Sequence, residues 1–132
     1  MRIWMSCLAL ICLLACGCKT KSTDDLIGNL KSGTSGERIA AVRLLPQHGE
    51  DAEKVVPALI ESLKDKKADV RWSAAIGLGY FGAQAKDAVP ALQLAVRDPD
   101  ARVREGARVA LSRIDPNQFP LGSNRDPYKK KK

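Results

Sequence analysis

The sequence is poor in the residues on which most chemical sites depend. It has 1 histidine, His48, and all 4 of its cysteines lie at or before Cys18. The rest of the chain can form neither a disulfide nor a cysteine-ligated metal site, so its stability must come from packing. It also shows no phosphate-binding glycine loop, dinucleotide-binding turn or serine–histidine–aspartate set. We therefore predict that the protein is not an enzyme, with no catalytic residue, metal, cofactor or small-molecule substrate.

The basic charge of the chain is concentrated outside its central region. The sequence has 22 Lys+Arg and 15 Asp+Glu, which gives a net charge of +7. Between Asp24 and Asp115 the basic and acidic residues are equal in number, so the excess comes from the two ends of the chain. A neutral central region does not provide the basic surface on which nucleic-acid binding depends. We therefore predict that the protein does not bind nucleic acid.

The first residues have the composition of an export signal. A basic start at Arg2 precedes the apolar run "IWMSCLALICLLAC". This run is shorter than the ~20 residues that cross a bilayer as a helix, but its length fits an export signal. The following "LLACGCK" resembles a bacterial lipobox, which implies lipidation of Cys16, with Cys18 as the alternative. We therefore expect a lipoprotein signal peptide over 1–15 and an acylated linker over 16–23. This linker would hold the protein to a membrane, on the extracytoplasmic side of the cell envelope.

A repeat of 33 residues organises the central region. "VVPALIESLKD" and "AVPALQLAVRD" are separated by this interval, and a weaker copy precedes them. Apolar residues recur at helical spacing, which predicts first helices over 24–32, 57–65 and 90–98, and second helices over 37–45, 70–78 and 103–111. The first helices align Leu26, Leu59 and Leu92. One helical pair cannot bury its own apolar face, so the pairs must stack.

Several residues predict where the helices begin and end. Pro57 and Pro90 fit first turns, and Asp98-Pro99 fits an N-cap followed by the first helical position. "TSGE" over 34–37 has the spacing of a capping box. Gly49 and Gly82 fit helix ends that need a left-handed backbone. The composition of residues 116–132 predicts a disordered basic tail, from which Phe119 and Leu121 are candidates for folding back over the last helix.

The predicted fold is all-α: a short right-handed α-solenoid of about three helix-turn-helix repeats, six helices, over residues 24–115. The second and third units resemble HEAT repeats, in particular the short class also found in phycobilisome lyases. The shared residues are Val-Pro-Ala-Leu in the first helix, a following Asp, and Val-Arg with a later alanine in the second helix. The resemblance implies that the Asp and the Arg of each unit pair as a structural ladder, Asp65 with Arg71 and Asp98 with Arg104, while Arg38 lacks its Asp.

The candidate binding site lies on the second helices, which line the concave side in proteins of this kind. Trp72, Ile76 and Tyr80 recur at a spacing of four and form a stripe beside the core positions. Their flanking residues in the neighbouring units are Arg43, Glu105 and Arg113. Aromatic and arginine residues are common interface anchors, so this stripe favours a scaffold that binds an unidentified protein. Three alternatives stay open: that Trp72 serves packing alone, that the chain is a lyase-like enzyme, and that it is a structural accessory subunit.

Overall fold

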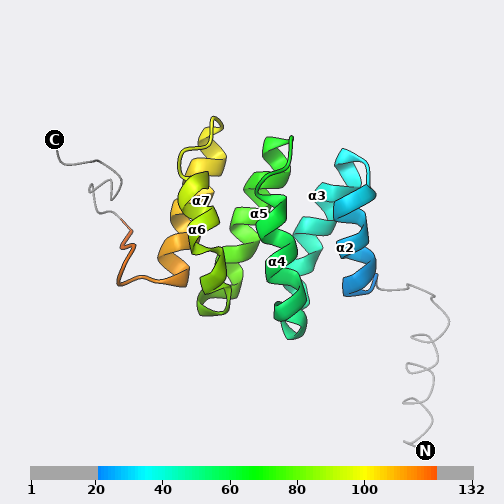
Figure 1. The fold of residues 1–132 in the computed structure, drawn as a ribbon, viewed down its shortest axis with the longest axis horizontal. Coiled ribbons are helices and arrows are strands. Elements are labelled where there is room, and N and C mark those ends of the chain that lie inside the picture. Colours follow the sequence, from blue (N-terminus) through cyan, green and yellow to red (C-terminus); the bar gives the residue numbers. More distant parts are fainter. Residues whose placement is uncertain (1–20, 122–132) are drawn as a thin grey trace, which may run out of the picture.

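The structure, a computed structural model, describes residues 21–121, which form three helical pairs side by side (Figure 1). The signal peptide, both candidate lipidation sites and the lysine tail lie outside the described residues. Within residues 21–121, no helix has the length and apolar character needed to cross a membrane. The pairs are α2 (Thr23–Ser32) with α3 (Ser35–Leu44), α4 (Ala52–Ser62) with α5 (Ala68–Phe81), and α6 (Val89–Ala95) with α7 (Ala101–Ile114). The predicted short α-solenoid with three helix-turn-helix repeats is confirmed.

The helices form two layers. The first helices, α2, α4 and α6, make one layer, and the second helices, α3, α5 and α7, make the other (Figure 1). α5 packs closely along both α3 and α7, whereas neighbouring helices of the first layer contact each other sparsely. Because the second helices lie closer together, the stack curves toward them, and they line its concave side.

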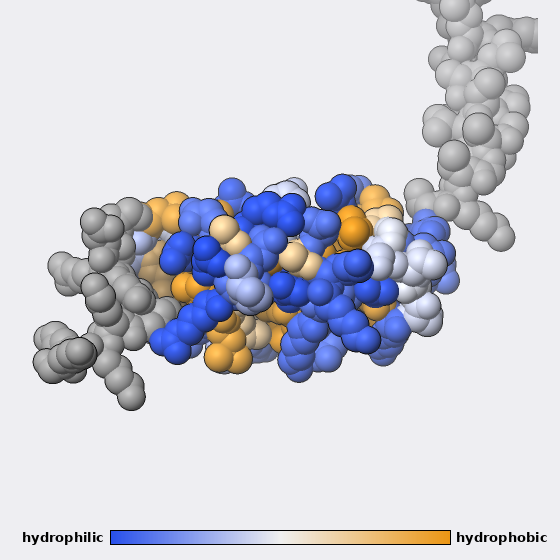
Figure 2. Space-filling model, turned by 90° about the horizontal axis from the view of Figure 1, so that it is seen from above, coloured by the Kyte–Doolittle hydropathy of each residue, from blue (hydrophilic) through white to orange (hydrophobic). Residues whose placement is uncertain are grey.

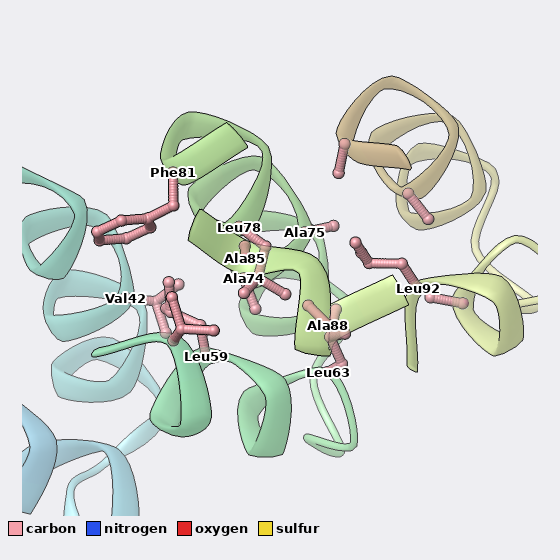
Figure 3. Close-up of a cluster of buried hydrophobic side chains, with 14 of the residues drawn as sticks. Val42, Leu59, Leu63, Ala74, Ala75, Leu78, Phe81, Ala85, Ala88 and Leu92 are labelled. Atoms are coloured by element: carbon pink, nitrogen blue, oxygen red, sulfur yellow. The ribbon is translucent and has the colours of Figure 1, made fainter. Parts of the chain in front are cut away.

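The core runs continuously through all three repeats. Leu26, Leu59 and Leu92 are at most 1% exposed, which confirms the register assigned to the first helices. Each repeat also buries an alanine of its second helix and a leucine in or directly after that helix, and Figure 3 shows Ala74 and Leu78 of the middle repeat in the cluster with Leu59. Each fully buried leucine stabilises the fold by about 1.5–3 kcal/mol. The aligned second-helix residues are Ala41, Ala74, Ala107, Leu45, Leu78 and Leu111.

The start of α7 differs from its prediction. The N-cap is Asp100, whose carboxylate accepts hydrogen bonds from the backbone N–H groups of Arg102 and Val103. Asp98 cannot serve this role because its carboxylate accepts from the backbone N–H of Asp100 and from the Arg71 guanidinium. The assignment of Asp98 as N-cap was therefore wrong by two residues.

The capping box predicted for the first repeat is confirmed. The Thr34 hydroxyl accepts from the backbone N–H of Glu37, and the Glu37 carboxylate accepts from the backbone N–H of Thr34. These reciprocal bonds satisfy two donors that the first turn of α3 would otherwise leave without a partner. α2 begins with a similar box between Ser22 and Asp25, which was not predicted from the sequence.

The two prolines of the repeat occupy different places. Pro90 lies in the first turn of α6, as predicted, but Pro57 lies inside α4. The segment before Pro57 belongs to the helix, and its Val55 and Val56 are buried against the core. The corresponding segment of the last repeat instead forms the 3₁₀ helix η3 (Gly82–Ala88). Pro57 is exposed, so water can solvate the carbonyl that receives no hydrogen bond from it.

The two candidate helix-ending glycines also differ. Gly82 ends α5 with φ +53°, a backbone conformation that favours glycine, as predicted. Gly49 does not have a positive φ, so that prediction was wrong. The first repeat leaves α3 through two 3₁₀ helices, η1 (Leu45–Gln47) and η2 (Gly49–Asp51), and His48 makes the bend between them. No left-handed residue is needed there.

The chain folds back after α7. The backbone N–H of Phe119 donates to the carbonyl of Asp115 at 2.9 Å, and the Phe119 ring packs against the core. Leu121, by contrast, is 63% exposed. The predicted return over the last helix therefore holds for Phe119 and not for Leu121.

Glycine allows α5 and α7 to approach closely. A Cβ atom added at Gly79 would lie 3.0 Å from the Cα of Ala110, which is a backbone atom. A Cβ added at Gly106 would lie 3.2 Å from Cδ1 of Trp72. The first contact cannot be relieved by a side-chain movement, because it would require the two helices to separate.

We expect Gly79→Ala to lower the free energy of unfolding by about 1–3 kcal/mol, as overpacked core positions do. The loss should appear despite the higher helix propensity of alanine, because α7 must move. Urea denaturation of the purified protein measures it directly.

Gly28→Ala is the matched control for this substitution. Gly28 is also inside a helix, but nothing lies within 4 Å of a Cβ added there. Alanine at this position should stabilise the protein by about 0.5–1 kcal/mol. If Gly79→Ala proved as stable as Gly28→Ala, the close approach of α5 and α7 would be incorrect.

Candidate functional site

The predicted aromatic stripe lies on the solvent side of α5. This helix is buried on most of its surface because α3, α4 and α7 pack around it. Tyr80 is 74% exposed and Ile76 is 37% exposed. Both therefore present apolar surface on the concave side, between the two flanking second helices.

Trp72 is less accessible than the sequence suggested. Its side chain is half-buried and packs against the core, next to Gly106 of α7. It thus supports the contact between α5 and α7, which is the packing role that the sequence analysis left open. The exposed apolar surface of the stripe comes mainly from Tyr80 and Ile76.

Charged residues surround the stripe. Arg43 of α3 and Glu105 and Arg113 of α7 are all exposed. The Cδ atom of Arg113 lies 3.6 Å from a Cβ placed at Gly79, so its side chain lies beside the residue that precedes Tyr80. The Glu105 carboxylate accepts from Arg108 at 3.5 Å. In the neighbouring repeats, Arg43, Glu105 and Arg113 occupy the register positions of Ile76, Trp72 and Tyr80, respectively, on the same layer of second helices.

One ion pair near the stripe was missed. Arg102 of α7 donates to Asp69 of α5 at 2.9 Å, next to the first turn of each helix. The two residues are 33 apart and therefore occupy the same register position in adjacent repeats. Comparing charges at equal register positions would have identified this pair. It links α5 to α7 at the end of the stripe nearest Trp72.

An arginine–aspartate ladder runs along the edge where the first helices turn into the second. Arg38 binds the Asp65 carboxylate through Nε and Nη2, at 2.6 and 3.2 Å. Arg71 binds the Asp98 carboxylate in the same way, at 2.7 and 2.9 Å. Figure 2 looks down on this edge, and its surface is largely hydrophilic. Each rung joins one repeat to the next.

This pairing corrects the one expected from the sequence. We expected Asp65 to pair with Arg71, Asp98 with Arg104, and Arg38 to lack an aspartate. Each arginine instead uses Nη1 to donate to a backbone carbonyl of its own loop: Arg71 to Asp65, and Arg104 to Asp98. This bond turns the rest of the guanidinium toward the following repeat. Repeat-by-repeat alignment could not show it, because the partner belongs to the neighbouring unit.

The ladder lowers the pKa of both aspartates. For Asp98, the hydrogen bonds from Arg71 are the main cause, and they outweigh the burial that opposes ionisation. For Asp65, burial raises the pKa, but hydrogen bonds from Arg38 and from the backbone of Lys67 together bring it below its ordinary value. The side chains of Asp65 and Asp98 are 12% and 10% exposed, so solvent screens these pairs weakly.

Metal-binding side chains are not gathered in the described part of the chain. Within residues 21–121, no group of three or more histidine, cysteine, aspartate or glutamate side chains is placed to hold a metal ion. His48 lies 3.9 Å from the Glu50 carboxylate in the turn between η1 and η2.

We expect Asp98→Asn to lower the free energy of unfolding by about 1.5–3 kcal/mol at pH 7, because it weakens a charge-assisted pair. A carboxylate with a lowered folded pKa stabilises the protein above its unfolded pKa of about 3.9 and loses this effect as the pH falls through the folded value. The difference between wild type and variant should therefore shrink between pH 7 and pH 3.

Urea denaturation at the two pH values measures this difference. Asp24→Asn is the control, since Asp24 is 76% exposed and meets Lys54 at 3.4 Å. Its effect should stay below about 1 kcal/mol. An equal loss for Asp98→Asn at pH 7 and pH 3 would contradict a charged rung.

Comparison with known proteins agrees with the geometry of the repeats. The HEAT repeats family matches residues 23–112, which covers all three helical pairs. A search of curated proteins found no match. The family match covers most of the sequence. It agrees with the two layers of paired helices, the common 33-residue register and the ladder between adjacent units. The chain belongs to the HEAT repeat family.

Proposed function

We propose that this protein is a membrane-anchored scaffold that binds a protein partner through the concave face of its second helices. The observation that carries the proposal is the exposure of Tyr80 and Ile76 at the centre of that face. Helical solenoids commonly bind partners on extended concave surfaces. An apolar centre with a charged rim is also the usual composition of a protein interface.

The rim indicates the charge of the partner. Arg43 and Arg113 are exposed on either side of the stripe, while the Glu105 carboxylate is already engaged with Arg108. Two basic side chains around an apolar centre favour a segment that carries an apolar anchor and flanking acidic residues. Complementary charge of this kind mainly improves association rate and specificity.

Two contacts between α5 and α7 support the face. Trp72 packs against the core beside Gly106, and the ion pair between Arg102 and Asp69 joins the two helices at the same end of the stripe. A surface that does not have to be ordered on binding loses less conformational entropy. This arrangement favours recognition by a preformed helical surface over recognition by a mobile loop.

We expect Tyr80→Ser to weaken partner capture from detergent-solubilised membranes by about fivefold or more, which corresponds to the loss of over ~1 kcal/mol typical of an anchor residue. The melting temperature should change little, because Tyr80 is exposed. Quantitative pull-down followed by mass spectrometry provides the measurement.

Leu94→Ser is the matched control. Leu94 is 76% exposed and Tyr80 is 74% exposed, but Leu94 lies on α6 in the opposite layer. Its replacement should leave capture unchanged. If Leu94→Ser reduced capture and Tyr80→Ser did not, the partner would bind the outer layer and the proposed face would be wrong.

The membrane anchor is a separate part of the proposal and rests on "LLAC", which ends at Cys16, and on the apolar run that precedes it. From Cys16 to Thr23 is seven residues, which span at most about 25 Å when extended. A lipid on Cys16 would therefore hold the first repeat close to the membrane surface.

Cys16→Ser should move the protein from the membrane fraction to the soluble fraction and abolish metabolic labelling with a fatty acid. Cys18→Ser should retain both properties. Continued labelling of Cys16→Ser together with loss of labelling in Cys18→Ser would transfer the modification to Cys18.

A further inference from the structure

The last rung of the ladder is open. Arg104 of α7 is oriented like Arg38 and Arg71, because its Nη1 donates to the carbonyls of Asp98 and Pro99 at 2.9 Å. In the two earlier arginines, Nε and Nη2 then bind a carboxylate from the following repeat. Within residues 21–121, no carboxylate forms an ion pair with Arg104. A guanidinium placed to receive a carboxylate thus stands at the end of the stack.

The surface around Arg104 is not built to pack a fourth repeat. Val42 and Ala75 occupy one register position and are 0% exposed, because the next repeat covers them. The same position in the last repeat holds Arg108, whose side chain is 56% exposed. Stacking another helical pair here would bury that charge. A segment thinner than a helical repeat could bring a carboxylate to Arg104 without burying Arg108.

A second copy of the chain does not supply this carboxylate by continuing the stack. The register position of Asp65 and Asp98 is occupied by Ser32 in the first repeat. Head-to-tail stacking would therefore bring a serine hydroxyl to Arg104, and it would still bury Arg108.

The chain itself carries a suitable carboxylate beyond the described residues. The triplet Arg97-Asp98-Pro99 contains the aspartate that binds Arg71, and the same triplet recurs as Arg125-Asp126-Pro127. We propose that Asp126 docks on Nε and Nη2 of Arg104 and completes the ladder with a third rung. The C-terminal segment would then take the place of the missing next repeat.

The spacing fits an extended segment. Each existing rung joins residues 27 positions apart. The proposed rung joins residues 22 apart (126 − 104), which is five fewer. In the existing rungs the returning chain includes α4, with 11 residues, or α6, with 7 residues. Extended chain covers the distance spanned by such a helix with about 4–6 fewer residues, because the rise per residue increases from ~1.5 to ~3.3 Å.

The path of the chain allows this contact. Phe119 is held against the core near the end of α7, by its hydrogen bond to Asp115. Figure 1 shows the described segment after α7 leaving on the side that faces away from α5, at the end of α7 opposite to its turn with α6. Arg104 lies 11 residues before Asp115, about 16 Å along the helix. The seven residues from Phe119 to Asp126 can span about 23–25 Å.

The test uses the full chain in detergent micelles at low ionic strength, and follows the Nε–H resonance of Arg104 by NMR. We expect solvent exchange of this proton to be about tenfold faster in Asp126→Asn than in the wild type. We also expect Asp126→Asn to lower the melting temperature by roughly 2–5 °C, as an exposed ion pair in a domain of this size would. In an Arg104→Gln background, Asp126→Asn should have no further effect.

Asp87→Asn is the control for the change in net charge, because Asp87 is exposed in η3. It should leave the Arg104 resonance unchanged, and Asp126→Glu should retain slow exchange. The proposal fails if Arg104 exchanges equally fast in the wild type and in Asp126→Asn, or if Asp126→Asn destabilises the Arg104→Gln variant equally. It also fails if slow exchange is lost on dilution, because a second copy would then supply the carboxylate.

Discussion

Burial of each repeat against the next is the constraint on which the rest of the structure depends. A helical pair of this size has too little interior of its own, so Leu26, Leu59 and Leu92 become buried only when neighbouring pairs cover them. The small residues of the second helices follow from this requirement. Gly79 faces the backbone of Ala110 because larger side chains would hold α5 and α7 apart. The curvature of the stack, and thus its concave face, results from this close packing.

The ladder fixes the register between adjacent repeats, which apolar packing alone does not determine. Leucines and alanines can pack in several registers, but a bidentate arginine–aspartate pair has a narrow geometry. Each arginine is fixed by a carbonyl of its own loop before it reaches the next repeat, as Arg71 is by Asp65. The pair therefore sets the rotation of one repeat relative to another. The same rotation determines how Arg43 and Arg113 are placed around Tyr80, so the ladder on one edge supports the geometry of the binding face.

The sequence predicted the parts of the structure that repeat. A 33-residue period identified the helices, the buried leucines and the fold, because core positions must recur in every unit. Prediction from the period failed where a residue contacts a neighbouring unit or where the units differ from one another. Arg38 was expected to lack a partner because its own repeat has Ser32 in place of an aspartate, whereas its partner is Asp65 of the following repeat. Pro57 and Pro90 are aligned, yet the segments before them pack differently and form different helices.

The binding face lies between these two cases. Helical spacing placed Trp72, Ile76 and Tyr80 on one stripe, but spacing does not predict how exposed each side chain is. Exposure depends on the neighbouring helix. Gly106 of α7 has no side chain, so Trp72 packs into the space beside it, while Tyr80, two turns further along α5, is 74% exposed. The aromatic residue that the sequence ranks first is therefore mainly part of the support. The tyrosine at the end of the stripe provides the accessible surface, and a glycine on another helix makes the space in which the tryptophan packs.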